Sequence, residues 1–243
     1  MQGSAKMLKL YHVLVDDDPL GGSREAEKVA IALSEIGADY EIIDLNRARD
    51  MRPADSEYRK SINHMATVPT LDNDGFLLRE SGAILNYLME LFPDSGLVPT
   101  DIQERARAME WVFWEGTCYC LFLLNLCYLH PFKALDPDPF DAIMPYRGGD
   151  QEADLKRAYQ SIGMLFQHLN AELEGVDYIA NNRYSVGDIA LGAHIALAGV
   201  LDIDLKPYPN VSAWLTRLAA RPAWQKEPVF MADWAVIKAK GLL

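Results

Sequence analysis

Cysteine, positive charge and long apolar runs are all scarce in this chain of 243 residues. Its three cysteines, Cys118, Cys120 and Cys127, are odd in number and close together. That pattern excludes a disulfide framework and fits a reducing compartment. The longest apolar run, Cys118–Leu129, has 12 residues, whereas a membrane-spanning helix needs about 20. The run therefore predicts a buried helical segment, with no membrane span.

Positive charge is in deficit, with 23 Lys and Arg against 35 Asp and Glu, a net charge of −12. A protein that neutralises phosphates needs a basic face, so we expect no nucleic-acid partner. An anionic membrane surface is excluded as a partner for the same reason. Met1–Lys6 is too short and polar to act as a secretory signal. We expect a soluble, cytoplasmic protein, and half of its residues are hydrophobic, enough for a sizeable core.

Metal-binding and nucleotide-binding motifs are also missing. The five histidines are scattered through the sequence, and His130 alone lies near the cysteines. Spacing of this kind predicts no metal centre, and it indicates that the cysteines act as small, buried apolar side chains. The sequence has no P-loop, no G-x-G-x-x-G and no G-x-S-x-G.

The first 92 residues alternate between strand and helix patterns. Asn73–Asp74–Gly75 is a hairpin turn signal, and Gly37 is suited to end a helix. Periodicity predicts the order β-α-β-α-β-β-α, with the elements Leu8–Val15, Ser23–Ile36, Tyr40–Leu45, Pro53–Ile62, Val68–Leu71, Phe76–Leu78 and Ser81–Phe92.

The remaining residues show only helical patterns. Predicted helices cover Asp101–His130, Gln151–Glu174, Ser185–Val200, Val211–Arg221 and a segment from Trp224 onwards, with an irregular excursion over Pro131–Asp150. The fold class is therefore an α/β domain at 1–92, a linker at 93–100 and an all-α domain at 101–243.

Thr67–Val68–Pro69 is the most informative local feature. A proline at the start of a short strand marks an edge or a bend. In the cis form it would leave the Val68 N–H and C=O available to a ligand's backbone, as an added strand pairs with a sheet edge. Because only about 5–6% of X–Pro bonds are cis, the local sequence alone favours an ordinary trans proline.

Two further features lie at predicted helix starts. Ser81 is expected to be the N-cap of the Ser81–Phe92 helix, whose free N–H groups suit a carboxylate, and Glu80 beside it suits an ammonium. Together they match the two ends of an α-amino acid, although the local sequence alone favours a plain cap. Ser23 begins the first helix, where an anion gains from the helix dipole. Alone, it too is consistent with an ordinary N-cap.

Aromatic residues are concentrated in Asp101–His130. A helix has about 3.6 residues per turn, so these side chains cannot all share one face. Most are expected in the core, and some in the groove between the two domains, where pockets commonly form. The candidates for that groove are Trp111, Trp114, Tyr119 and Phe122.

Across residues 7–230 the chain resembles the glutathione S-transferase family. No single motif carries the resemblance, but an ordered set does. Asn63–Pro69 is similar to the family's N-P-x-x-x-V-P, with His64 in place of proline. Glu80–Ser81 matches the family's E-S pair, and Ala83–Leu88 is similar to the helix that follows it. Ser185–Ile189 resembles the family's capping motif, and Leu218–Pro222 resembles its late helix ending.

The resemblance implies a thioredoxin-like first domain, a helical second domain and a homodimer. It implies glutathione as co-substrate and no metal. Pro69 would then be cis, and Thr67, Val68, Pro69, Glu80 and Ser81 would bind glutathione, with Glu80–Ser81 on its γ-glutamyl end. The small hydrophobic electrophile, in this protein an aromatic one, would occupy the interdomain groove and be attacked by the glutathione thiolate.

The family activates the sulfur with Tyr, Ser or Cys. No cysteine precedes Cys118, and Tyr11 lies too early in the chain. Counting back from Lys28–Val29, which resembles the family's basic–hydrophobic pair, places Ser23 at the Ser-type position. A backbone amide in the acidic Asp16–Gly22 loop is the alternative.

One of five basic residues is expected to bind the glycine carboxylate of glutathione: Arg47, Arg49, Arg52, Arg59 or Lys60. Two other functions remain open. The chain is similar to bacterial β-etherases, which cleave aryl ethers with glutathione, in its tryptophan-rich helix and the extended segment after it. A non-catalytic glutathione-binding or scaffold protein of the same fold is the second alternative.

Overall fold

The computed structural model describes residues 7–14, 22–97, 99–129 and 150–243. The predictions made for Met1–Lys6, for nearly all of the Asp16–Gly22 loop and for Pro131–Asp150 up to its last residue lie outside this part of the chain.

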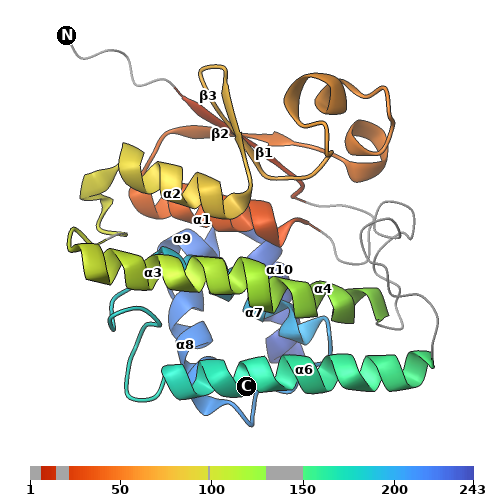
Figure 1. The fold of residues 1–243 in the computed structure, drawn as a ribbon, viewed down its shortest axis with the longest axis vertical. Helices are drawn as coiled ribbons and strands as arrows, with labels where there is room; N and C mark the ends of the chain where they lie inside the picture. The colour runs from red at the N-terminus through yellow and green to blue at the C-terminus, as the bar shows by residue number, and fades with distance from the viewer. Residues whose placement is uncertain (1–6, 15–21, 98, 130–149) are drawn as a thin grey trace.

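The first half contains a four-stranded mixed sheet in the order β2-β1-β3-β4. Its strands are β1 (Leu8–His12), β2 (Tyr40–Asp44), β3 (Thr70–Asn73) and β4 (Phe76–Arg79). β1 is parallel to β2 and antiparallel to β3, which forms the predicted hairpin with β4. Figure 1 shows α1 (Arg24–Ile36) and α2 (Ser81–Leu91) between this sheet and the second half of the chain.

Local chemistry explains the bounds of α1. Ser23 is its N-cap, and the side-chain oxygen accepts from the Ala26 N–H. Gly37 ends the helix at φ 73°, a left-handed conformation in which glycine carries no steric penalty. The single helix predicted for Pro53–Ile62 is wrong, because the structure has two short π-type turns, η1 (Arg47–Met51) and η2 (Tyr58–Ile62).

The second half is helical, as predicted. The long helix expected from Asp101 is interrupted by a π-turn, so that α3 (Ile102–Trp114), η4 (Glu115–Tyr119) and α4 (Cys120–Leu129) follow one another directly. The remaining elements are η3 (Pro93–Ser95), α6 (Gln151–Glu172), α7 (Val186–Ile195), η5 (Ala196–Gly199), α8 (Pro209–Ala219), α9 (Pro222–Gln225) and α10 (Pro228–Ala239).

Helix α7 forms the centre of the helical half, and all of its residues are buried. The capping motif implied at Ser185–Ile189 is present as a capping box, in which Asp188 accepts from the backbone N–H of Ser185 at 2.9 Å. The same carboxylate accepts from the Trp214 indole N–H at 2.9 Å, which ties α7 to α8. Among the helices in the described residues, none is long and apolar enough to cross a membrane.

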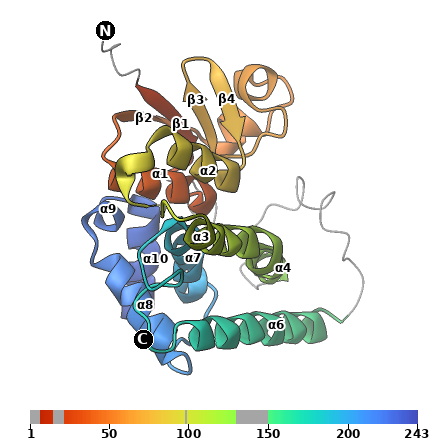
Figure 2. The ribbon, with the colours of Figure 1, turned by 60° about the vertical axis from the view of Figure 1, so that its left-hand side comes forward.

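Helices α9 and α10 return to the first half and lie against α1 (Figure 2). Arg24 donates to both carboxylate oxygens of Asp233, at 2.9 and 2.6 Å. At the other end of α1, Arg221 makes the same two-pronged contact with Glu35, at 2.7 and 2.8 Å. Two bidentate pairs therefore fix the C-terminal part of the chain to both ends of α1.

Candidate functional site

Three segments far apart in sequence meet at one edge of the sheet. In the register, Tyr11 near the end of β1 pairs with Thr70 at the start of β3, which pairs with Arg79 at the end of β4. Pro69 and Glu80 directly adjoin this row. The Ser23 N–H donates to the Val13 carbonyl at 2.8 Å, which brings the start of α1 to the same edge.

The Val68–Pro69 peptide bond is cis, as the family resemblance implied. The loop before it is fixed from one side: the Tyr58 hydroxyl donates to the Thr67 carbonyl at 2.7 Å, and the Asn63 amide donates to it at 2.8 Å. No hydrogen bond within the described part of the chain involves the backbone N–H or C=O of Val68. Both groups are therefore available to an extended ligand.

Glu80, and not Ser81 as expected, is the N-cap of α2. Glu80 is exposed at φ 68° and caps no backbone N–H with its side chain. Ser81 is the first helical residue and is nearly buried. Its hydroxyl donates to a carboxylate oxygen of Glu25 in the first turn of α1, at 2.5 Å. This bond places Ser81 and the start of α1 next to each other.

Ser23 is 7% exposed. Its oxygen accepts from the Ala26 N–H at 3.3 Å, and no group in the described residues accepts its proton. A serine hydroxyl both donates and accepts, so this proton can be donated to an anion at the helix start. Gly22 is required beside it, because a Cβ there would lie 2.4 Å from the Leu14 carbonyl oxygen.

Behind Ser81 lies a group of buried and half-buried charged side chains of which the sequence gives no sign. The Lys28 ammonium contacts Glu25 at 2.7 Å and Glu115 at 2.9 Å. His194 of α7 lies 2.5 Å from Glu115 and 3.4 Å from Glu25. The Cys120 thiol is 3.5 Å from Glu25. The members come from α1, η4, α4 and α7, so nothing in their spacing along the chain could have revealed the group.

Pairing determines the ionisation of this group. Burial opposes the charge on Glu25, but the Lys28 ammonium and His194 outweigh it and hold the Glu25 pKa well below its usual value. Burial likewise opposes the charge on Lys28, and the carboxylates of Glu25 and Glu115 raise its pKa above the usual value. Both side chains are therefore ionised at neutral pH.

The same group contains four potential metal ligands, on Glu25, Glu115, Cys120 and His194, whose ligand atoms lie within 4.8 Å of one another. The Lys28 ammonium already occupies the position between the two carboxylates that a cation would take. Burial also raises the pKa of the Cys120 thiol, with Glu25 and Glu115 adding to the effect, which opposes the thiolate that metals bind. The donor set thus fits an internal ammonium better than a metal ion.

The predicted groove aromatics lie in different places. Tyr119 is 1% exposed and packs edge-on against Phe166 of α6, so it offers no surface to a substrate in this structure. Trp111 is buried as well, with its ring 5.4 Å from that of Trp114. Trp114 and Phe122 keep some exposed surface. Of the four predicted aromatics, these two are the ones that a ligand could contact without rearrangement of the protein.

At least two of the five basic residues in 47–60 that were predicted to bind a carboxylate already contact other groups of the protein. Arg49 is paired with its neighbour Asp50, and Arg59 donates to the Arg52 carbonyl at 3.1 Å. Lys60 is exposed. The expectation that one of the five basic residues binds a carboxylate stays a prediction.

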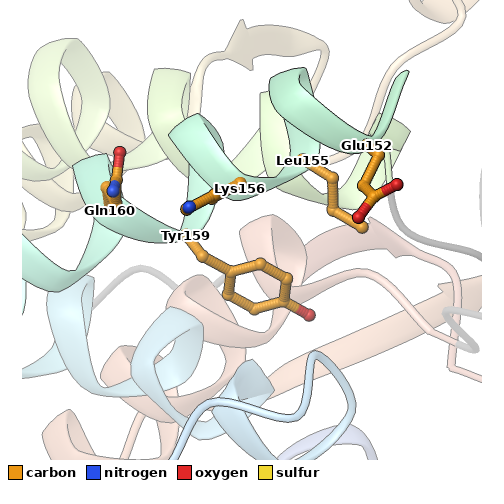
Figure 3. A pocket seen from close by; sticks show the side chains of 5 residues that line it. All are labelled: Glu152, Leu155, Lys156, Tyr159 and Gln160. Carbon is orange, nitrogen blue, oxygen red and sulfur yellow. The ribbon is translucent and has the colours of Figure 1, made fainter. Parts of the chain in front are cut away.

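A separate shallow hollow, lined by Glu152, Leu155, Lys156, Tyr159 and Gln160, lies along α6 and contains none of the predicted site residues (Figure 3).

A mixed β2-β1-β3-β4 sheet with a cis-proline before β3, followed by an all-helical half, defines a thioredoxin-like domain joined to a glutathione-transferase-type helical domain. Comparison with known proteins agrees. Residues 20–96 match the family model "Glutathione S-transferase, N-terminal domain", and residues 122–222 match "Glutathione S-transferase, C-terminal domain".

The chain belongs to the glutathione S-transferase family. It is 31% identical to Glutathione S-transferase D7 of Drosophila melanogaster over 208 residues, which cover 84% of this chain and 83% of that protein. Among solved structures, a glutathione transferase from Methylococcus capsulatus is 27% identical with a TM-score of 0.67, covering 98% of this chain and 100% of its own. A possible glutathione S-transferase from Rhodopseudomonas palustris is 26% identical with a TM-score of 0.69, covering 89% and 87%.

Proposed function

We propose that this protein is a glutathione transferase that stabilises the thiolate of glutathione for attack on a small hydrophobic, aromatic electrophile. The observation that supports this most is the meeting of Ser23, Val68 and Ser81 at one edge of the sheet. An extended peptide paired with the Val68 backbone at that edge would direct its γ-glutamyl end and its central cysteine towards different segments. Its γ-glutamyl end would lie at Glu80–Ser81 and its sulfur at Ser23.

Ser23 is proposed as the catalytic residue. A free thiol has a pKa of about 8.5, and each unit by which the site lowers it makes the thiolate about 1.4 kcal/mol easier to form. A helix N-terminus and one hydrogen-bond donor can supply such an effect. The Ser23 hydroxyl sits at the N-cap of α1 with its proton uncommitted among the described residues.

Thr67, Val68, Pro69, Glu80 and Ser81 are proposed to bind glutathione, with one of the basic residues of 47–60 on its glycine carboxylate. The electrophile would contact the exposed surfaces of Trp114 and Phe122. Homodimerisation, a cytoplasmic location and a role in detoxification are proposed from family membership alone.

A second candidate function, glutathione-dependent cleavage of aryl ethers, is favoured by the aromatic α3–α4 segment, in which Trp111 and Trp114 stack edge to face. The two activities differ in their products. Both form a thioether between the glutathione sulfur and a carbon of the substrate, but ether cleavage breaks a carbon–oxygen bond and releases a phenol as the leaving group. A non-catalytic protein would bind glutathione and turn over neither substrate.

The test is the pH–rate profile of Ser23→Ala with a generic aromatic electrophile. Loss of one preorganised donor is expected to lower the rate at neutral pH by roughly ten- to a thousandfold and to move the profile to higher pH. Ser56→Ala is the matched control, because Ser56 also accepts a backbone N–H, that of Arg59 at 3.2 Å, in a different segment. A profile identical to that of the parent would remove Ser23 from the mechanism.

A further inference from the structure

The side chain of Tyr58, in η2, is 5% exposed and belongs to a small core of its own. Val13, Leu45 and Met51 are the other buried members of this core, and Val68 packs against it. The core therefore supports the loop whose backbone groups are proposed to pair with glutathione.

The Tyr58 hydroxyl has two contacts at this edge of the sheet. It donates its proton to the Thr67 carbonyl at 2.7 Å, and its oxygen lies 3.0 Å from the Thr70 hydroxyl. A phenol has one proton, so Thr70 is the donor in the second contact. Burial raises the pKa of Tyr58 above its usual value, which keeps the proton on the hydroxyl at neutral pH.

The Thr67 carbonyl is held from two directions. A carbonyl oxygen has two lone pairs, and the Asn63 amide donates to the same oxygen at 2.8 Å. Asn63 is 2% exposed, and its own side-chain oxygen accepts from the Met65 N–H at 3.0 Å, which fixes the orientation of its amide. A rotation of the Thr67–Val68 peptide would therefore break two hydrogen bonds at once.

The fixed carbonyl determines the direction of the next amide. The Thr67–Val68 peptide is trans, and in a planar trans peptide the C=O and N–H point in opposite directions. Because the carbonyl points towards Tyr58 and Asn63, the Val68 N–H points away from both. In the part of the chain that the structure describes, this N–H has no hydrogen-bond partner. It is a preorganised donor that the fold itself does not use.

One residue of glutathione has both groups that the Val68 backbone would pair with. The cysteinyl residue has an amide N–H on one side and a carbonyl on the other. The γ-glutamyl residue has no amide N–H of its own, and glycine ends in a carboxylate. Extended chains pair by joining the N–H of one to the C=O of the other. The Val68 N–H therefore suits the cysteinyl carbonyl.

We propose that Tyr58 is a positioning residue for glutathione: its hydroxyl, by holding the Thr67 carbonyl, directs the Val68 N–H at the cysteinyl carbonyl. The inference rests on the proposed glutathione site and adds a residue that does not itself touch the ligand. Tyr58 acts only on a ligand that has this carbonyl. Its contribution is therefore separable from a general effect on the fold.

The test compares glutathione with an analogue in which an (E)-alkene replaces the cysteinyl–glycine amide. The analogue keeps the thiol, the γ-glutamyl end and the glycine carboxylate but has no cysteinyl carbonyl. Dissociation constants are measured by calorimetric titration with the parent protein and with Tyr58→Phe, which removes one oxygen and keeps the ring. Glutathione should bind the variant about threefold to tenfold more weakly, the loss typical of one hydrogen bond. The analogue should bind both proteins equally within about twofold.

Two matched variants assign the effect. Tyr159→Phe also removes a hydroxyl that donates to a backbone carbonyl, that of Leu201 at 2.9 Å in the helical half, and should leave the affinity for both ligands unchanged. Thr70→Val removes the other partner of the Tyr58 hydroxyl but keeps its bond to Thr67. Glutathione affinity should then stay within about twofold of the parent. Urea unfolding at the titration pH checks that each variant is folded.

A measurement on the parent protein needs no substitution. In nitrogen–proton NMR spectra, bound glutathione should move the Val68 amide proton downfield, because that proton gains an acceptor. The alkene analogue should leave it in place. A Val68 amide that responds equally to the two ligands would show that its N–H does not bind the cysteinyl carbonyl, and the inference would be wrong.

The titrations separate this inference from the proposed function. An equal loss of affinity for both ligands in Tyr58→Phe overturns the inference, because the hydroxyl then supports the loop as a whole. A loss of the same size in Thr70→Val, or an unchanged glutathione affinity in Tyr58→Phe, overturns it as well. In these cases the parent still binds glutathione and the proposed function stands. If the parent binds neither ligand, the proposed function fails and the inference fails with it.

Discussion

Glu27 provides a sharp test of how buried ionisable groups affect the stability of this protein. Its side chain, on α1, is fully buried, as is that of His12 at the end of β1. One Glu27 oxygen accepts from the Phe230 N–H at 2.9 Å. The other oxygen lies 3.6 Å from the His12 ring nitrogen, and neither atom has a hydrogen-bond partner among the described residues.

Burial raises the pKa of Glu27 to about 8, and the nearby charges of Glu227 and Asp233 add to the effect. Burial also lowers the pKa of His12 to about 4. Both groups are therefore neutral near pH 7. Because the Glu27 pKa is higher in the folded protein, its favourable contribution is complete below pH 4.5 and is lost as the pH rises to about 8. The loss is at most about 5 kcal/mol, at 1.36 kcal/mol per pH unit.

The contribution of His12 to stability changes with pH in the opposite direction. Its pKa is depressed on folding, so its contribution is complete above about pH 6.5 and is lost as the pH falls towards 4. Between pH 4.5 and 6.5 the slopes of these two residues oppose each other and nearly cancel. Between pH 6.5 and 8 only the Glu27 slope remains of the pair. That interval is where a Glu27 variant is most informative.

Glu27→Gln removes the ionisation while its carbonyl oxygen can still accept from the Phe230 N–H. The variant should be more stable than the parent at pH 8.5, by up to about 5 kcal/mol, and should gain nothing at pH 4.5. Urea unfolding followed by tryptophan fluorescence, at one protein concentration and several pH values, measures this difference. Glu172→Gln, at an exposed position, should leave the pH dependence unchanged. Equal slopes for parent and Glu27→Gln between pH 6.5 and 8 would show that Glu27 does not titrate there.

Two further stability predictions can be measured in the same assay. Gly192→Ala should destabilise the fold by about 1–3 kcal/mol, because the added Cβ would lie 2.5 Å from the Trp224 ring in the core. Gly163→Ala is its control, since that Cβ would meet only ordinary contact at 3.5 Å, and the helix propensity of alanine should stabilise α6 by about 0.5–1 kcal/mol. Asp188→Ala should cost about 3 kcal/mol or more, since it leaves several buried donors, including the Trp214 indole, without an acceptor. An unfolding free energy for Asp188→Ala within about 1 kcal/mol of the parent would contradict the hydrogen-bond assignment.

Local patterns predicted the regular elements well where one physical signal dominates. The hairpin turn at Asn73–Gly75 follows from residues that tolerate positive φ, and the structure has Asp74 at 56° and Gly75 at 89°. The capping motif at Ser185–Ile189 was given by the family resemblance, and the structure has a capping box there. The cis form of Pro69 was not predicted by its neighbours; it came from the ordered set of motifs along the whole chain.

Other features depend on contacts that sequence spacing does not encode. The helix was predicted for Pro53–Ile62, whereas the structure has two π-type turns in 47–62; the second contains Tyr58, whose hydroxyl donates to the Thr67 carbonyl. The predicted helix Asp101–His130 has the expected extent in the described residues, but its π-turn carries no local signal. Glu115, in that turn, meets Lys28 and His194 across 87 and 79 positions, and no periodicity predicts such a meeting.

The helical half also fixes the start of α1. Ser23, the proposed catalytic residue, caps α1, and almost every polar side chain in the first turns of that helix is held by another part of the chain. Arg24 binds Asp233 of α10, and Glu27 accepts from the Phe230 N–H of the same helix. Further partners, Glu115 of η4 and His194 of α7, meet Lys28 and Glu25, so we expect a change in the packing of the helical half to move the start of α1. A shift there would displace the Ser23 hydroxyl, so substitutions remote from glutathione are expected to change the thiolate pKa before they change glutathione affinity.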